Sequence, residues 1–268
     1  MPPMTPLAEA TDQAEFGGKA MALGVAVRAG LPVPAGFALS VDAVEAVVRE
    51  EPDVLAALRA ACADGGARAV RSSAVGEDSG TASFAGAHCT VLGVCRPEAV
   101  VAAVRRVHAS GATAGARAYR SRLGLGPCRM GVVVQDLVTA DTAGVLFTRN
   151  PVTGAAERVI EASWGLGEAV VAGLVVPDRY RLDPRGRVLE RTGGEKDVAL
   201  RAGPAGTEEV AVAGPAVSAP CLDDAQLAVL HALAEACDAA YGTTEHDIEF
   251  AFSGGTVFLL QRRPITGG

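Results

Sequence analysis

The stretch "DIEFAFSGGTVFLLQRRP", residues 247–264, has the pattern of two β-strands joined by a turn that contains glycine. Apolar and polar residues alternate in its first half, so Ile248, Phe250 and Phe252 share one face of a strand. We expect a loop of three residues, 253–255, to connect this strand to the next one. The stretch therefore predicts an antiparallel hairpin that turns one apolar face to a core.

The other face of this hairpin carries charged and amide side chains. With a three-residue loop, Glu249 lies opposite Leu259 and Asp247 lies opposite Gln261. Glu249, Gln261 and Arg263 then share the polar face, and the Cα atoms of diagonal neighbours are about 7–8 Å apart. A two-residue Gly-Gly turn would place Glu249 and Gln261 on opposite faces instead.

Two interpretations of this polar face stay open. At that spacing the carboxylate of Glu249 and the amide oxygen of Gln261 can reach one ion, and both are hard oxygen ligands of the type that Mg²⁺ accepts. The alternative is a solvent-exposed face on which a glutamate and an arginine form an ion pair.

A second unusual stretch is "VRSSAVGEDSGTASFAGAHCT", residues 70–90. It combines an arginine, an acidic pair, several hydroxyl side chains and glycines with almost no large apolar residue. Such a composition suits either a loop that holds a ligand or a flexible linker.

The whole chain has the size and composition of a globular protein. It has 268 residues, of which 49% are apolar, enough for two modest domains or one large one. The formal net charge is −7 and the lysines and arginines form no continuous run, so we expect no nucleic-acid partner. Any bound anion should be small and held locally.

The sequence also bears on compartment and metal content. The six cysteines form no C-x-x-C pair, so neither a zinc site nor a disulfide framework is expected. No apolar run approaches the roughly 18 residues of a membrane span, and the first residues lack the pattern of a signal peptide. We expect a cytoplasmic protein with no membrane partner.

Helical and strand patterns alternate along the chain, which predicts an α+β fold. Helices are expected at 19–29, in two pieces of 41–63 divided at Pro52, at 97–108 and at 222–241; strands are expected at 67–70, 129–138, 143–148, 157–163, 180–183 and 187–191. The stretch 201–220 is expected to be a surface loop. A change of composition near Gln135 predicts two lobes, 1–135 and 136–268.

Seven motifs occur in an order that resembles a known family. They are "FGGKAMALGVAVRAGLPVPAGFALS", "AVRSSAVGEDSGTASFAGAHCT", "MGVVVQDLV", "AGVLFTRNPVTG", "VIEASWGLGEAVVAG", "VVPDRY" and "DIEFAFSGGTVFLLQRRP". Together they resemble the ATP-binding domain of pyruvate phosphate dikinase and phosphoenolpyruvate synthase, over nearly the whole chain. The resemblance implies an ATP-grasp fold, with two lobes and the nucleotide cleft between them. It also implies an ATP-dependent phosphotransferase of the kinase or dikinase type.

The resemblance assigns phosphate contacts to four residues in the first half of the chain. Lys19 in "GGKA" and Arg71 in "VRSS" match the phosphate-contacting lysine and arginine of the family, both catalytic. Gly86 and Thr90 match the glycine-rich loop that closes over the phosphates, where small residues allow close backbone approach and hydroxyls donate. The alternative is that Lys19 and Arg71 are ordinary surface cations.

The resemblance also assigns a hinge and a metal site. Gln135, Asp136 and Leu137 match the hinge whose backbone reads adenine. Glu249 and Gln261 match ligands of Mg²⁺, and Arg263 matches an adjacent catalytic arginine that contacts phosphate. Neither "GGKA" nor "GGEKD" fits the Walker A pattern, which disfavours a P-loop ATPase.

The family passes a phosphoryl group to a histidine on a separate domain, which delivers it to a third, acceptor-binding domain. None of the four histidines here lies in the context of that carrier: His88, His108, His231 and His246. The resemblance therefore implies a separate phosphohistidine-carrier protein, an acceptor-binding protein and a small-molecule acceptor.

Three functions stay open at this point. The chain could be the ATP-cleaving subunit of a split dikinase. It could be a stand-alone kinase that phosphorylates a small molecule directly, as in specialised metabolism or antibiotic phosphotransfer. It could also be a nucleotide-binding module without turnover, although the filled site positions argue against that.

Overall fold

The computed structural model of the chain describes residues 3–76, 89–113, 115, 117, 126, 128–203 and 206–265. The chain divides into two compact units. Unit 1 comprises Met1–Arg28, Pro34–Leu137 and Pro204–Gly206, and unit 2 comprises Ala29–Val33, Val138–Gly203 and Thr207–Gly268. Each unit contains an antiparallel sheet with helices against it, which confirms the predicted α+β class.

Unit 1 is built on a five-stranded sheet in which all neighbouring strands are antiparallel. In sheet order the strands are β1 (Thr5–Pro6), β2 (Gly36–Leu39), β5 (Met130–Asp136), β3 (Arg68–Ala74) and β4 (Thr90–Val94). The helices are η1 (Leu7–Glu9), α1 (Gln13–Arg28), α2 (Val41–Val48), α3 (Pro52–Ala61) and α4 (Pro97–Ser110). The predicted helix division at Pro52 and the predicted helix start at Pro97 are confirmed, because proline is tolerated in the first turn of a helix but not in its interior.

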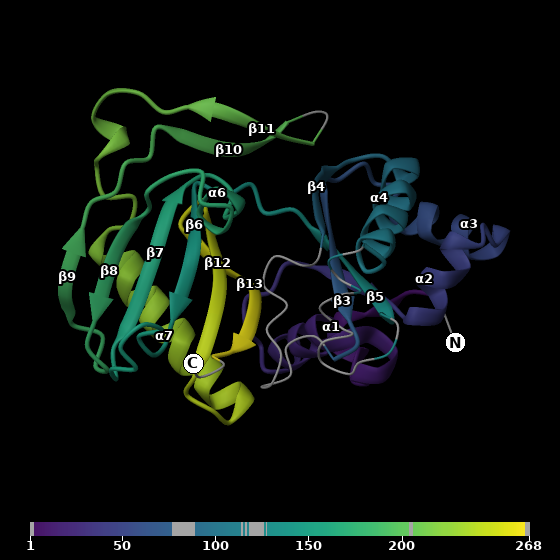
Figure 1. The fold of residues 1–268 in the computed structure, drawn as a ribbon, viewed down its shortest axis with the longest axis horizontal. Helices are drawn as coiled ribbons and strands as arrows, with labels where there is room; N and C mark the ends of the chain where they lie inside the picture. Colours follow the sequence, from purple (N-terminus) through teal and green to yellow (C-terminus); the bar gives the residue numbers. More distant parts are fainter. Residues whose placement is uncertain are drawn as a thin grey trace. The chain divides into compact units, whose positions relative to one another are not determined.

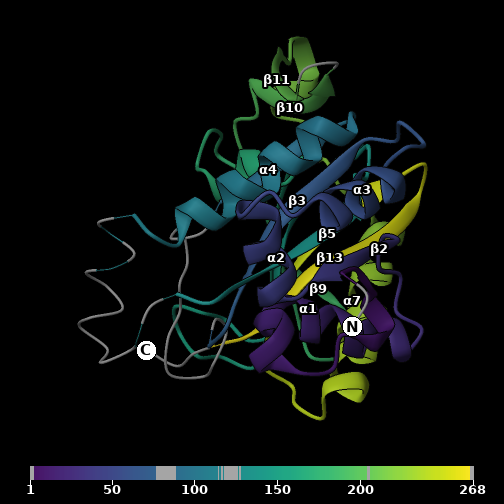
Figure 2. The same ribbon diagram turned by 90° about the vertical axis from the view of Figure 1, so that its right-hand side faces the viewer.

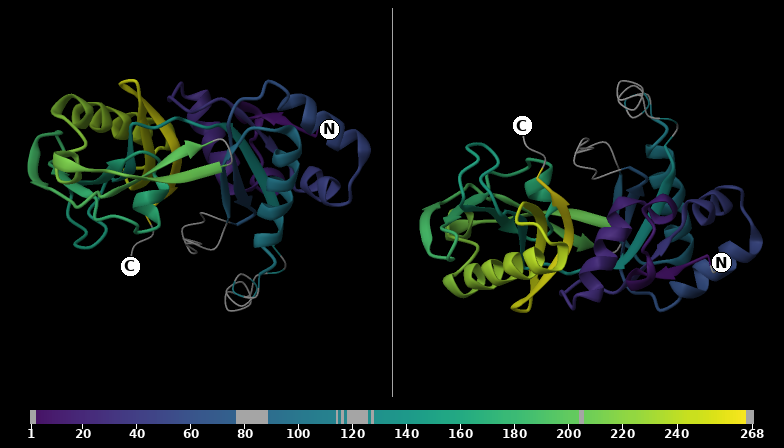
Figure 3. Two further views of the ribbon diagram at one scale, coloured as in Figure 1. Left: turned by 90° about the horizontal axis from the view of Figure 1, so that it is seen from above. Right: turned by 90° about the horizontal axis from the view of Figure 1, so that it is seen from below.

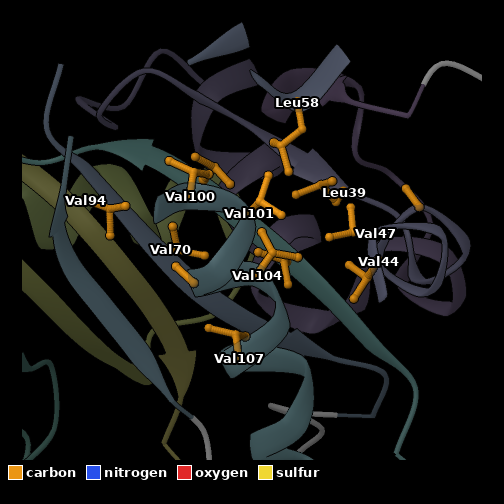
Figure 4. Close-up of a cluster of buried hydrophobic side chains, with 14 of the residues drawn as sticks. Leu39, Val44, Val47, Leu58, Val70, Val94, Val100, Val101, Val104 and Val107 are labelled. Carbon is orange, nitrogen blue, oxygen red and sulfur yellow. The ribbon is translucent and has the colours of Figure 1, made fainter. Parts of the chain in front are cut away.

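A cluster of aliphatic side chains joins α2, α3 and α4 to one face of this sheet (Figure 4). The sheet contributes Val70, Ala74, Val132 and Val134, which alternate along β3 and β5 with residues of the other face. Figure 2 shows the three helices lying over these strands. The apolar core of unit 1 therefore occupies one side of the sheet, and the alternate residues of β3 and β5 face the other side.

Helix α1 packs on that other side and bends where it meets β3. The helix starts at Gln13, earlier than the predicted residue 19, and is interrupted at Gly17, which has φ +80°. An ideal Cβ at Gly17 would lie 1.9 Å from the carbonyl oxygen of Ser73, so only glycine allows this approach. The N–H of Ala20 then donates to Ser73 Oγ at 2.9 Å.

Unit 2 is built on a six-stranded antiparallel sheet (Figure 1). In sheet order the strands are β13 (Thr256–Pro264), β12 (His246–Ser253), β6 (Thr142–Phe147), β7 (Arg158–Trp164), β8 (Asp178–Leu182) and β9 (Val188–Thr192). The helices are α6 (Glu168–Val171) and α7 (Asp224–Tyr241). Helix α7 lies on one face of the sheet in both views of Figure 3, and Leu230, Leu233 and Cys237 on it are buried, whereas Tyr241 at its end is half-buried.

The stretch 201–220 contradicts the prediction of a surface loop. It contains the end of β10 (Val198–Gly203), all of β11 (Gly206–Ala211) and the short helix η2 (Gly214–Val217), and β10 and β11 form a two-stranded sheet. Nearly all residues of β11 are exposed, so this strand lacks the apolar alternation that reveals a half-buried strand. The backbone of β11 pairs with that of β10. A stretch rich in glycine, proline and glutamate gives no side-chain pattern that predicts such a pairing.

No helix within the described ranges has the length and apolar character needed to cross a membrane.

Candidate functional site

Three predicted residues of unit 1 lie on one face of its sheet. Arg71 on β3 is directly opposite Thr90 on β4 and opposite Val133 on β5. Gln135 is two residues further along β5, on the same side as Val133. Arg71, Thr90 and Gln135 therefore face the side of the sheet on which α1 packs.

The two predicted phosphate-contacting cations are both buried. Lys19 is 4% exposed and Arg71 is 8% exposed, so the interpretation of both as ordinary surface cations is wrong. Lys19 directly precedes Ala20, whose N–H is bonded to Ser73, two residues along β3 from Arg71. The bend at Gly17 thus brings the backbone of Lys19 against the strand that carries Arg71.

The glycine-rich stretch is described only at its two ends. Gly86 falls within residues 77–88, which lie outside the described part of the chain. The first residues of the stretch are buried strand β3, and Thr90 is the first residue of β4 rather than a loop residue. Thr90 owes its position opposite Arg71 to this pairing.

The predicted hinge has two backbone donors that are already paired inside unit 1. The N–H of Asp136 donates to Ala35 O at 2.8 Å, and the N–H of Leu137 donates to Ala67 O at 2.9 Å. The side chain of Gln135 donates to Pro34 O at 3.3 Å. An adenine base at this hinge would have to use carbonyl oxygens or displace one of these bonds.

In unit 2, the hairpin turn differs from the prediction. Ser253 pairs with Thr256, so the loop contains only Gly254 and Gly255 instead of three residues. Both glycines have positive φ, +55° and +79°. Two successive left-handed residues form the tight turn whose twist matches that of the strands, and glycine adopts it without steric cost.

A β-bulge nevertheless places Glu249 and Gln261 on the same face, as we had expected from a three-residue loop. Phe250 pairs with Leu259, but Glu249 pairs with Gln261, so Leu260 is an extra residue in β13. The predicted pairs of Glu249 with Leu259 and of Asp247 with Gln261 are therefore wrong. A two-residue turn without a bulge would place Gln261 on the opposite face from Glu249. The bulge places the two residues side by side.

The charged face of the hairpin also carries Asp247. Asp247 lies directly opposite Arg263, on the same face as Glu249 and Gln261. Strand alternation had placed Asp247 there, but nothing in the sequence singled it out as a site residue. Arg263 Nη2 is 3.8 Å from Glu249 Oε1, and both side chains are less than a quarter exposed.

The donor set of this face fits a magnesium ion. Directly opposed residues of an antiparallel pair have Cβ atoms about 4.5–5.5 Å apart, so the Glu249 carboxylate and the Gln261 amide oxygen can reach one ion. Mg²⁺ binds few protein oxygens and keeps water and phosphate oxygens in its remaining positions. Gln261 is 2% exposed, which limits its side chain to few orientations.

A buried ion pair lies on the other face of the same sheet and has a structural role. Asp178 accepts hydrogen bonds from Lys196 Nζ at 2.6 Å and from the N–H groups of Gly194 and Cys221 at 2.7 Å. Burial alone would raise the pKa of Asp178, but these bonds outweigh it and lower the pKa. Neither side chain of the pair is more than 1% exposed.

Comparison with protein families places most of the chain in one of them. Residues 51–268 match the family described as "Pyruvate phosphate dikinase, AMP/ATP-binding domain". This range includes Arg71, the hinge and the hairpin, and it begins after Lys19.

Individual relatives agree with this match. A probable phosphoenolpyruvate synthase of Methanothermobacter thermautotrophicus is 41% identical over 201 residues, which are 74% of this chain and 29% of that protein. A rifampicin phosphotransferase of Streptomyces sviceus is 36% identical in an alignment of 301 residues that covers 94% of this chain and 34% of that protein. The chain thus spans about a third of the length of these curated relatives.

A solved structure supports the fold. The crystal structure of a protein from Pyrococcus horikoshii Ot3 has a TM-score of 0.50 at 16% identity and covers 96% of this chain and 94% of its own. The chain has the α+β ATP-grasp fold that its motifs predicted. Because the family match extends over far more than half of its residues, the chain belongs to the family of the pyruvate phosphate dikinase AMP/ATP-binding domain.

Proposed function

We propose that the chain binds ATP with Mg²⁺ and cleaves it as the ATP-binding subunit of a split dikinase-type system. In this system the phosphoryl group passes to a histidine of a separate carrier protein. The observation that supports this most is the pairing of Glu249 with Gln261 beside Arg263, within a chain of an ATP-binding family.

The residues of unit 1 would bind the phosphates. Lys19 on α1 and Arg71 on β3 are buried cations, and Thr90 adds a hydroxyl opposite Arg71. Lysine and arginine side chains bind phosphate oxygens through charge-assisted hydrogen bonds, so these two buried cations suit an anionic ligand. Positioned cations stabilise the charge that develops on a transferring phosphoryl group by about 3–4 kcal/mol each.

The residues of the hairpin in unit 2 would hold the metal and a phosphate. Glu249 and Gln261 are the ligands that we assign to Mg²⁺, and Arg263 is the cation next to them. When bound, the ion would neutralise charge on the phosphate oxygens. The chain itself would orient the nucleotide through these three side chains.

The acceptor nitrogen must come from elsewhere in this proposal. His108 contacts Glu45 at 3.0 Å, His231 lies 3.4 Å from Glu235 and His246 is fully buried. His88 is outside the described residues. Phosphoryl transfer needs the acceptor in line and within about 3–3.5 Å of phosphorus, which the two glutamate contacts and the burial of His246 oppose.

A second candidate is direct phosphorylation of a small molecule. It is favoured by the rifampicin phosphotransferase that is similar over 94% of the chain. The two candidates differ in the acceptor, which is a protein histidine in the first and a small organic hydroxyl or acid in the second. A nucleotide-binding module without turnover is disfavoured because every proposed position is filled.

The experiment is to incubate the purified chain with Mg·ATP labelled at the β-phosphate, with and without a carrier protein of this family. We expect slow release of nucleotide from the chain alone and no phosphohistidine on it. The carrier should accelerate turnover, become labelled and leave AMP, with orthophosphate released as water is consumed. If the chain alone makes a small phosphate ester at about 1–10³ s⁻¹, the second candidate replaces the first.

A further inference from the structure

One row of side chains crosses the whole sheet of unit 2 on the face that α7 covers. The register places these residues side by side, one from each strand from β13 to β9: Arg262, Ile248, Leu146, Ile160, Tyr180 and Arg191. The row is apolar in the middle and has an arginine on each edge strand. Six strands spaced about 4.8 Å apart span about 24 Å, which is close to the roughly 27 Å length of the 18-residue α7.

Each of the two arginines contacts one end of α7. Arg191 on β9 forms an ion pair with Asp224, the first residue of the helix. Arg262 on β13 lies over the ring of Tyr241, the last residue of the helix, with its guanidinium carbon 4.3 Å from the ring centroid. The helix is thus tied to both edges of the sheet.

The contact at the β13 end is the more elaborate of the two. Arg262 Nε donates to His246 Nδ1 at 2.7 Å, and the His246 side chain is fully buried. His246 Nε2 then carries the ring proton and lies 3.1 Å from Asp238 Oδ1, on the last turns of α7. The Tyr241 and His246 rings are 5.8 Å apart. Arg262 is therefore held by both β12 and α7.

This anchor lies next to the proposed metal ligands. Arg262 is the residue between Gln261 and Arg263, and it follows the bulge at Leu260 by two positions. Strand β13 is the edge strand of the sheet next to β12, and a bulge locally disrupts the ladder and increases the twist of the strand that carries it. A side chain fixed on the α7 face obliges its two neighbours to turn to the other face.

Building on the proposed function, we infer that Arg262, held by His246 and Tyr241, is a positioning residue for the metal and phosphate site. It keeps Gln261 and Arg263 on the face of Glu249 and so sets the geometry in which Mg·ATP binds. Arg262 itself contacts neither the metal nor the nucleotide.

The test compares Arg262→Met with Arg191→Met. The two arginines stand at opposite ends of one row and contact opposite ends of one helix, so both changes loosen α7 but only the first is beside the hairpin site. We expect Arg262→Met to weaken Mg·ATP binding about 10-fold or more, the usual effect of losing a group that orients a metal ligand. Arg191→Met should leave it within about twofold. Equal effects of the two changes on affinity would overturn the inference.

A rescue variant separates positioning from general packing. His246→Leu removes the acceptor for Arg262 and should weaken Mg·ATP binding as Arg262→Met does, whereas His246→Gln keeps an acceptor oxygen and should restore most of the affinity. The His246→Leu/Arg262→Met double variant should be no worse than either single variant, because both remove the same contact. Additive losses would contradict the proposed anchor. If Arg262→Met does not fold, Arg262→Gln, which keeps a donor, takes its place.

A readout without nucleotide separates this inference from the proposed function. Amide hydrogen exchange in residues 246–249 and 261–263 should be faster in Arg262→Met than in Arg191→Met. If the unchanged chain shows no Mg·ATP binding, the proposed function fails. The amide hydrogen exchange rates then test by themselves whether Arg262 fixes the position of its neighbours in β13. Identical exchange in both variants would rule it out.

Discussion

Glu249 on β12 lies directly opposite Gln261 on β13, and it does so only because Leu260 is an extra residue in the second strand. The turn of two glycines by itself would place Gln261 on the face of α7. A bulge shifts the register by one position, and a shift of one exchanges the faces of all residues beyond it. The metal-ligand pair that we propose is therefore a product of two local irregularities that compensate each other.

The first prediction concerns this pair. Glu249→Ala should abolish the part of ATP-dependent thermal stabilisation that requires Mg²⁺, and Gln261→Ala should reduce it, because a charged ligand contributes more than a neutral one. The measurement is the melting temperature with ATP in the presence of Mg²⁺ and of EDTA. Glu209→Ala, an exposed glutamate on β11, is the control and should behave as the unchanged chain. Retained Mg²⁺ dependence in Glu249→Ala would exclude this metal site.

The second prediction concerns the buried cations of unit 1. Lys19→Met and Arg71→Met should each lower ATP turnover about 100-fold or more, since a positioned cation contributes about 3–4 kcal/mol to transition-state stabilisation. Turnover is measured as AMP release with the carrier protein present. Arg59→Met removes a half-exposed arginine that is paired with Glu98 and should have no effect. Normal turnover in both buried variants would remove Lys19 and Arg71 from the site.

The third prediction concerns the close approach of α1 to β3. Gly17→Ala should destabilise the protein more than Gly30→Ala, although both glycines have positive φ. Each change introduces left-handed strain of about 1–2 kcal/mol, but only at Gly17 does the new Cβ meet an atom, Ser73 O. Urea denaturation of the two variants measures the difference. Equal losses would show that α1 can shift away from β3 at no cost.

The fourth prediction concerns the buried ion pair of unit 2. Lys196→Met leaves the Asp178 carboxylate buried without its cation and should lower the free energy of unfolding by about 3–5 kcal/mol. Arg187→Met removes an exposed arginine from its pair with Asp183, which keeps the N–H groups of residues 185 and 187 as donors, and should cost less than about 1 kcal/mol. A mild effect of Lys196→Met in the same denaturation experiment would mean that water reaches Asp178.

The fifth prediction is a pH dependence that arises at His246. Burial and the neighbouring Arg262 lower the pKa of this histidine from 6.5 to about 4. The unfolded chain then binds the proton more readily than the folded chain, so stability that is complete above pH 6.5 is lost as the pH falls towards 4. The loss amounts to about 3 kcal/mol. In His246→Gln the free energy of unfolding should change less between these two pH values, and an unchanged slope would contradict this assignment.

Several elements follow from local signals in the sequence. The break between α2 and α3 at Pro52 and the start of α4 at Pro97 follow from what proline permits at a helix start. The buried stripe of α7 follows from helical periodicity, and the apolar face of β12 follows from alternation. These features depend on residues near in sequence, and they are the features that a pattern predicts well. The ordered motifs also identified the family.

What the sequence by itself determined is thus the α+β class, the main helices and strands and the family, and it also supplied the residue types of the proposed site. Only the tertiary structure decided the register of the hairpin, the burial of Lys19 and Arg71, and the β10–β11 pair in a stretch predicted as a loop. It also brought Arg262 to His246 and to Tyr241. The physical reason is that these features arise from contacts between segments that are distant in sequence. The type of turn, the position of a bulge and the helix that covers a face all depend on packing across the whole sheet.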